Sequence, residues 1–163
     1  MRRLHGISSA TLASAWLLAS TSGSIHAEGG GNHFSYGYCT WGAAEQAHRV
    51  WGIWIPWFGD AGDWAASARA AGWSVSPIPQ ADTIIVMPRH VQGSGPDGHV
   101  GWVLDVDPDN GGVTVLSMNW GRYNEVTRHH VVVDGIVQFV APASPDQAAA
   151  ARLAAGAALA THS

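Results

Sequence analysis

The chain has 163 residues, of which 47% are hydrophobic and 12% charged, and its net charge is −4 at pH 7 with histidine neutral. This length predicts one domain, or two at most, and the charged fraction is about half of the average of about 25%. So little charge, together with 20 glycines and 8 prolines, argues against a disordered chain or a coiled coil. The lack of a basic excess argues against nucleic acid as a partner.

The N-terminus has the pattern of an export signal. Arg2 and Arg3 form a short positive region, and residues 7–19 are apolar and rich in small side chains. This run is too short and too rich in serine for a membrane span, which takes about 20 apolar residues. We therefore expect residues 1–27 to be a cleaved signal peptide, without stable membrane insertion afterwards. Cleavage would leave six arginines against 12 acidic residues, so the mature charge would be 6 − 12 = −6.

The remaining chain divides into three zones by composition. Residues 28–34 are a glycine-rich lead-in, residues 35–141 resemble a compact domain, and residues 142–163 form an alanine-rich tail. The front of the compact zone predicts two helices, over residues 39–49 and 60–71, from their helix formers and apolar spacing.

The back of the compact zone predicts short strands. Their apolar positions are residues 83–87, 99–106, 113–118, Val126 with 131–133, and 136–140. Asp134-Gly135 lies between the last two runs and is typical of a hairpin turn. Two helices followed by such strands predict an α+β domain with an antiparallel sheet.

Cys39 is the only cysteine of the chain and stands at the start of the first predicted helix. The dipole of a helix start favours an anion, so a thiol there tends toward the thiolate that attacks carbonyl groups. His99 follows a glycine-rich loop, residues 92–98, and is suited to act as its general base. Position alone leaves open whether these two side chains meet or whether Cys39 is a buried, inert thiol.

Six segments in collinear order resemble the CHAP domain, the cysteine- and histidine-dependent amidohydrolase/peptidase family. They are Tyr36–Trp41 (similar to G-x-C-T-W), Phe58–Ala65, Ala71–Val75, Pro79–Val86, Gly98–Val103 (similar to G-H-V-A-x-V) and Val115–Trp120 (similar to V-S-E-M-N-W). The resemblance runs from about Phe34 to Val140. It implies a papain-like α+β fold, with N-terminal helices packed on an antiparallel sheet of about five to six strands.

The resemblance also implies roles for individual residues. Cys39 is expected to be the nucleophile, His99 the general base, and Asn119 the residue that orients the imidazole. Four further residues are expected around the oxyanion site or the substrate cleft: Tyr38, Trp41, Ser117 and Trp120. Many family members carry glutamate at the position of Ser117, and a serine supplies no charge there.

The function implied by the resemblance is hydrolysis of amide bonds in bacterial cell-wall peptidoglycan through a cysteine thioester. The enzyme would be secreted or associated with the cell wall, or periplasmic if the source has an outer membrane. It would be an endopeptidase or an N-acetylmuramoyl-L-alanine amidase. The alternative is a catalytically weak wall-binding module that retains the fold. We expect a monomer that needs no cofactor.

Two groups of side chains remain open to more than one interpretation. The loop Trp51–Phe58 either packs over the sheet, which we favour, or forms a rim on which a sugar stacks. His129 and His130 could suggest a metal, but neighbouring strand residues point to opposite faces of a sheet, so we expect no metal site.

Overall fold

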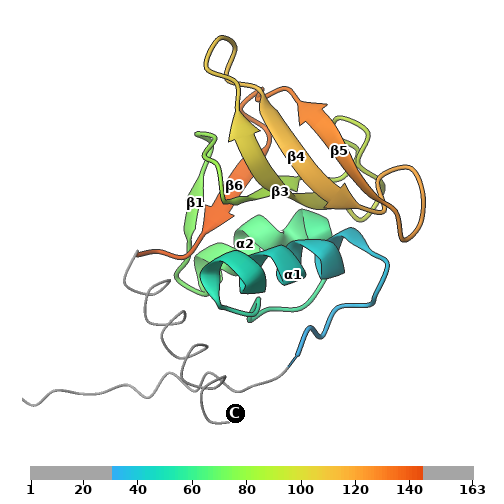
Figure 1. Cartoon of the computed structure of the whole chain (residues 1–163). Coiled ribbons are helices and arrows are strands. Elements are labelled where there is room, and N and C mark those ends of the chain that lie inside the picture. Colours follow the sequence, from blue (N-terminus) through green and yellow to red (C-terminus); the bar gives the residue numbers. More distant parts are fainter. Residues whose placement is uncertain (1–30, 145–163) are drawn as a thin grey trace, which may run out of the picture.

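The computed structural model of the chain describes residues 31–144, which form a layer of helices beneath a twisted antiparallel sheet (Figure 1). The predicted signal peptide lies outside the described residues, as do residues 28–30 of the glycine-rich lead-in and residues 145–163 of the alanine-rich tail. The division of the chain into these zones therefore stays a prediction. The described residues contain no helix long and apolar enough to cross a membrane.

Helix α1 (Cys39–Trp51) begins at the cysteine, where the extended backbone of Tyr38 turns into the first helical residue. It ends at Gly52, which adopts φ 74° and donates its N–H to the carbonyl of His48 at 2.8 Å. A positive φ is easily adopted only by glycine, so the sequence itself stops the helix here. Small buried alanines line the inner face of α1 and let the helix lie close to the sheet.

The second predicted helix is present, but its first turn is tighter than expected. It consists of the 3-10 turn η1 (Ala61–Asp63) and helix α2 (Trp64–Ala70). The strands are β1 (Ser74–Ser76), β2 (Ile84–Met87), β3 (His99–Val106), β4 (Val113–Met118), β5 (Val126–Val131) and β6 (Gln138–Ala141). They form one sheet in the order β1-β6-β2-β3-β4-β5, and every neighbouring pair is antiparallel.

The predicted hairpin at Asp134-Gly135 is wrong. β5 is an edge strand that pairs with β4, whereas β6 lies between β1 and β2 on the other side of the sheet. The turn itself exists, because Gly135 has φ 82° and the Asp134 carboxylate accepts the N–H of Ile136 at 2.9 Å. Phe139 and Val140 point to opposite faces of β6 and are both buried, so this strand belongs in the interior of the sheet.

The sheet separates two hydrophobic clusters. The cluster between sheet and helices is rich in tryptophan and includes Trp64, which is fully buried, and Trp102, which is almost fully buried. The cluster on the other face consists mainly of aliphatic side chains with Phe139. Trp57 packs edge-on against Trp64 at 5.8 Å between ring centroids, so the tryptophan-rich loop packs into the core, as favoured above. Phe58, at its end, and Pro56 are exposed.

Candidate active site

Two elements that are far apart in the sequence hold the predicted nucleophile and base. Cys39 is the first residue of α1, His99 is the first residue of β3, and α1 packs against β3. Both side chains are buried, at 8% and 6% exposed respectively. The thiol accepts a backbone hydrogen bond from Val100, the residue that follows His99. The fold therefore brings the thiol beside the start of the strand that carries the predicted base.

Burial raises the pKa of the Cys39 thiol above its ordinary value, although backbone hydrogen bonds from Val100 and Thr40 act in the opposite direction. The charge of Asp97 raises it further. This corrects the expectation that a position at a helix start favours the thiolate. The loss of hydration of the sulfur outweighs the favourable helix terminus, because desolvation disfavours the charged form of any acid.

Ser117, on β4, is the hydrogen-bond partner of the His99 imidazole. Its Oγ lies 2.5 Å from Nε2 of His99, and the same hydroxyl lies 3.3 Å from the carbonyl oxygen of Val100 and 3.4 Å from that of Met118. A carbonyl oxygen only accepts, so a hydroxyl proton directed to either carbonyl leaves the hydroxyl oxygen free to accept from the imidazole. In that arrangement the hydroxyl oxygen accepts a hydrogen bond from Nε2–H of His99, and Nδ1 is unprotonated and able to act as a base.

The pKa of His99 is lowered to about 4, first by burial and second by its electrostatic interaction with His129. Trp120 connects these two rings: its centroid lies 4.8 Å from that of His99 and 4.2 Å from that of His129, in a stacked arrangement. At neutral pH the site therefore rests as an uncharged thiol and an uncharged imidazole rather than as an ion pair.

Asn119 lies two residues beyond Ser117, just after the end of β4. It is half-buried, has φ 61°, and donates its backbone N–H to the carbonyl of Glu125 at 2.9 Å. Within residues 31–144 its side-chain amide makes no hydrogen bond, so the structure joins Ser117 rather than Asn119 to the imidazole. The role of Asn119 in orienting His99 stays a prediction. Ser117, expected from the sequence as a cleft residue, shares the buried face of β4 with Val113 and Val115.

The other predicted cleft residues surround this group. Tyr38 precedes the cysteine and is 48% exposed. Trp41 is half-buried and lines a small cavity of about 70 Å³ together with Ser117 and Met118. Trp120 covers the imidazole as described. Sequence reasoning missed Tyr123, in the loop after β4, whose ring lies edge-on to Tyr38 at 5.4 Å.

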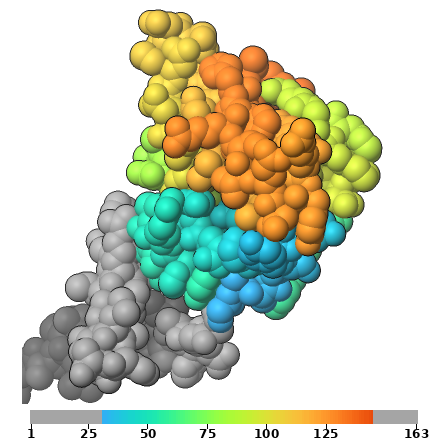
Figure 2. Space-filling model, turned by 45° about the vertical axis from the view of Figure 1, so that its right-hand side comes forward, coloured from blue at the N-terminus to red at the C-terminus, as the bar shows by residue number. Residues whose placement is uncertain are grey.

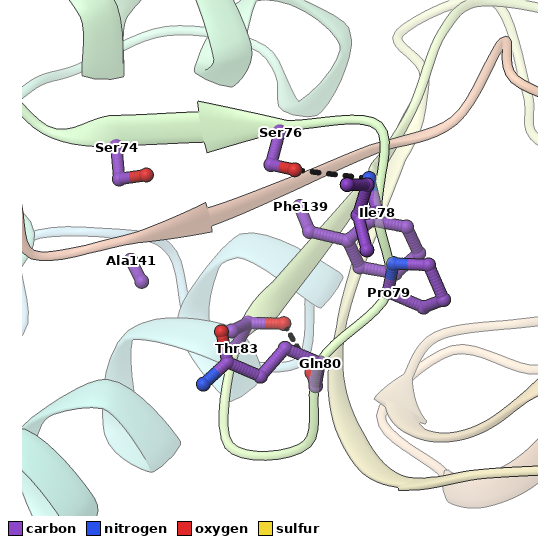
Figure 3. A pocket seen from close by; sticks show the side chains of 8 residues that line it. All are labelled: Ser74, Ser76, Ile78, Pro79, Gln80, Thr83, Phe139 and Ala141. Carbon is purple, nitrogen blue, oxygen red and sulfur yellow. Dashed lines mark hydrogen bonds between the residues drawn. The ribbon is translucent and has the colours of Figure 1, made fainter.

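A larger hollow of about 390 Å³ lies over β1, β6 and the start of β2, and the structure places none of the predicted site residues there (Figure 3). Two of its polar groups are already used locally: the Ser76 hydroxyl accepts the N–H of Ile78 at 2.9 Å, and the Thr83 hydroxyl donates to the carbonyl of Gln80 at 2.6 Å. Its lining contains no acid, base or thiol, so it offers no catalytic chemistry. Within the described part of the chain no three His, Cys, Asp or Glu side chains gather as metal ligands.

Comparison with known proteins identifies the family to which this geometry belongs. The family model described as "CHAP domain" matches residues 29–119. The chain is 31% identical over 114 residues to "Probable autolysin LDP" of Staphylococcus aureus, covering 68% of this chain and 37% of that protein. Its fold resembles the crystal structure of an N-acetylmuramoyl-L-alanine amidase from Staphylococcus aureus, with a TM-score of 0.59, 21% identity, and coverage of 65% of this chain and 30% of the other.

The chain spans little more than a third of the length of the curated relatives it matches. The aligned part includes the segments that carry Cys39, His99 and Ser117 in the family match.

Proposed function

The chain belongs to the CHAP domain family, and on this premise we propose that it is a cysteine-dependent hydrolase that cuts an amide bond in bacterial peptidoglycan. The observation that carries the proposal is the buried group formed by Cys39 beside the start of β3 and by His99 with its Nε2 on Ser117. The names of the staphylococcal relatives, an autolysin and an amidase, support the same substrate class.

In the proposed first step, Cys39 Sγ attacks the carbonyl carbon of the scissile amide while its proton passes to Nδ1 of His99. Because burial opposes both the thiolate and the imidazolium, the proton transfer accompanies the attack rather than preceding it. The oxyanion accepts a hydrogen bond from the backbone N–H of Cys39, which lies in the first turn of α1, where backbone N–H groups have no partner within the helix. In this mechanism Ser117 accepts a hydrogen bond from Nε2–H throughout, so that Nδ1 stays available as the base.

The bond between carbon and nitrogen then breaks, and His99 returns the proton to the leaving amine. This leaves a thioester between Cys39 and the acyl part of the substrate. A water molecule attacks the thioester carbon, gives one proton to His99, and releases the carboxylic acid. The proton passes from His99 to the sulfur, which restores the resting thiol. We further propose that the protein acts outside the cytoplasm, after removal of residues 1–27, as a monomer without a cofactor.

The proposal is tested by measuring the release of soluble fragments from purified peptidoglycan sacculi. Cys39→Ala and His99→Ala should each lower release at least about 10³-fold, because nucleophile and base act as a unit. His130→Ala is the matched control, since His130 is exposed on β5. Its release should equal that of the unaltered protein.

Equal release by the unaltered protein and by Cys39→Ala would overturn the enzymatic proposal. If neither protein released fragments while both bound sacculi, the chain would instead be a wall-binding module. Mass spectrometry of the fragments identifies the bond, either within the peptides or at the junction of sugar and peptide.

A further inference from the structure

Three exposed tyrosines stand beside the nucleophile, and the catalytic steps above do not use them. Tyr36, Tyr38 and Tyr123 are 58%, 48% and 63% exposed, and we refer to them as the tyrosine ridge. The first two belong to the segment before α1, and the third belongs to the loop between β4 and β5. These two segments lie against each other in both views of the molecule (Figures 1 and 2).

The ridge is a built structure rather than three loose side chains. The Tyr123 hydroxyl donates to the carbonyl of Tyr36 at 3.1 Å, and the rings of Tyr38 and Tyr123 meet edge-on at 5.4 Å. Tyr36 in turn meets Trp41 edge-on at 4.7 Å. A backbone hydrogen bond of 3.2 Å from Asn124 to Gly37 ties the two segments together. Ring positions are therefore set before any ligand arrives.

The backbone of the two segments leaves room for these rings. Gly37 has φ 91°, which glycine adopts readily, and a Cβ at this position would lie 2.6 Å from the ring of Tyr123. Asn124 has φ 61°, a left-handed conformation that asparagine adopts more often than most residues. The rings of the ridge nevertheless remain about half exposed or more. Aromatic rings that are fixed in place and left exposed in the segment leading to the nucleophile indicate a binding surface.

The charges of the ridge favour a neutral ligand. The two segments that form it, residues 35–38 and 119–125, contain one cation, Arg122, which is already paired with Glu125 at 3.8 Å. Asp97 adds negative charge near the thiol. The peptides of peptidoglycan carry free carboxylates, which would meet no free cation on these segments, whereas its sugar rings are neutral apart from groups engaged in amide bonds.

We propose that the tyrosine ridge binds a sugar ring of the peptidoglycan glycan strand, which stacks its apolar face on the exposed phenol rings. This inference rests on the proposed function and narrows it. Tyr38 is adjacent to Cys39, and consecutive Cα atoms lie about 3.8 Å apart, so a ring on the ridge sits close to the attacked carbonyl. The bond favoured by this geometry is the amide at the junction of sugar and peptide.

The test measures binding separately from hydrolysis, with the Cys39→Ala protein. It is titrated with the disaccharide N-acetylglucosaminyl-N-acetylmuramic acid, whose lactyl carboxylate is blocked as its methylamide, and, in a second series, with the sugar-free stem peptide, while the NMR signals of the tyrosine rings are followed. The disaccharide should shift the signals of Tyr38 and Tyr123, and the stem peptide should not. Tyr123→Leu should weaken disaccharide binding about tenfold, near the upper end of one aromatic stacking contact.

Two further variants make the result specific. Tyr123→Phe keeps the ring and removes only the hydroxyl, so its affinity should stay within about threefold of that of the parent protein. Phe58→Leu removes a ring that is 72% exposed but packs at a tilt against His33 rather than against a ring of the ridge, and it should leave disaccharide binding unchanged.

The proposal is overturned if the disaccharide leaves the tyrosine signals in place, if Tyr123→Leu binds it as the parent does, or if the stem peptide shifts the same signals. The sacculus assay of fragment release is independent of these binding measurements. If fragment release depends on Cys39 but the disaccharide does not bind, the proposed enzyme activity is supported and sugar binding by the ridge is overturned. If the disaccharide binds but fragment release does not depend on Cys39, sugar binding by the ridge is supported and the proposed enzyme activity is overturned.

Discussion

Among single residues, Ser117 has the most consequential contact, because its hydroxyl is the hydrogen-bond partner of Nε2 of His99. A carboxylate in its place would stabilise the imidazolium by charge, whereas the hydroxyl can only orient the ring. The low pKa of His99 agrees with a site that lacks such a charge. A neutral hydroxyl partner thus suits a base that is uncharged in the resting enzyme.

Ser117→Ala should lower kcat about 10-fold to 100-fold and leave KM nearly unchanged, since one buried hydrogen bond to the base is lost. Ser117→Thr keeps the hydroxyl and should recover most of the activity. Nitrogen NMR of the imidazole provides a second measurement, in which the Nε2–H form should dominate only when a hydroxyl is present. An unchanged tautomer in Ser117→Ala would show that Ser117 does not position His99.

The lowered pKa of His99 also predicts how the stability of the folded protein depends on pH. The unfolded chain protonates this imidazole near its ordinary pKa of 6.5, whereas the folded protein does so only at about 4. Unfolding therefore takes up a proton between these values, and this contribution to stability is lost as the pH falls from about 6.5 to about 4. The loss is on the order of 3 kcal/mol.

Denaturant unfolding at pH 7 and pH 4.5 checks this expectation. The unaltered protein should lose more stability between the two pH values than His99→Gln, which has no group to titrate at this position. The same pH dependence in both proteins would mean that His99 is not desolvated in the folded state.

At the scale of elements, the loop before β3 determines where His99 enters the sheet. Gly98 has φ 75°, and a Cβ there would lie 2.5 Å from the backbone of Gly62, which belongs to η1. The N–H of Gly62 donates to the carbonyl of Asp97 at 2.8 Å, so η1 and the loop are in direct backbone contact. The start of β3 is thus held by the helical layer as well as by its neighbouring strands.

Gly98→Ala should therefore destabilise the protein and also lower its activity, because the clash is with backbone atoms that cannot move aside. Gly111→Ala is the matched control, since Gly111 has φ 71° with nothing within 4 Å of a new Cβ. Gly111→Ala should lower the free energy of unfolding by only about 1–2 kcal/mol, the cost of a positive φ for alanine, and should leave activity unchanged. Thermal unfolding and sacculus hydrolysis measure both effects, and equal losses in the two variants would contradict a steric role for Gly98.

At the scale of the whole molecule, stability depends on an unusually aromatic layer between the helices and the sheet. Trp64 is fully buried and contacts Trp57 and Phe34. Its indole N–H finds no hydrogen-bond partner among the described residues. The side chain therefore contributes through packing, and its polar atom adds a desolvation cost.

Trp64→Ala should lower the free energy of unfolding by about 3–5 kcal/mol, as for other large aromatic side chains removed from a core. Trp64→Phe should cost clearly less, because it retains much of the packing and removes an unpaired N–H. Denaturant titration of the three proteins gives these values. A loss in Trp64→Phe as large as that in Trp64→Ala would show that the N–H is in fact satisfied.

The sequence alone determined the α+β class, the start of α1 at Cys39 and the start of β3 at His99. These features depend on local signals: apolar periodicity, helix formers, and glycines that stop or turn the chain. The family was also visible from the sequence, because six short motifs in fixed order place the same residues on the same elements.

Only the tertiary structure decided the neighbours of the strands and the neighbours of the site. It placed β6 away from β5, joined Ser117 to His99, and brought Tyr123 to Tyr38. It also reversed the expected direction of the Cys39 pKa. The physical reason is the same in each case: burial and contacts between distant segments depend on what the rest of the chain places around a residue, and no local pattern records this.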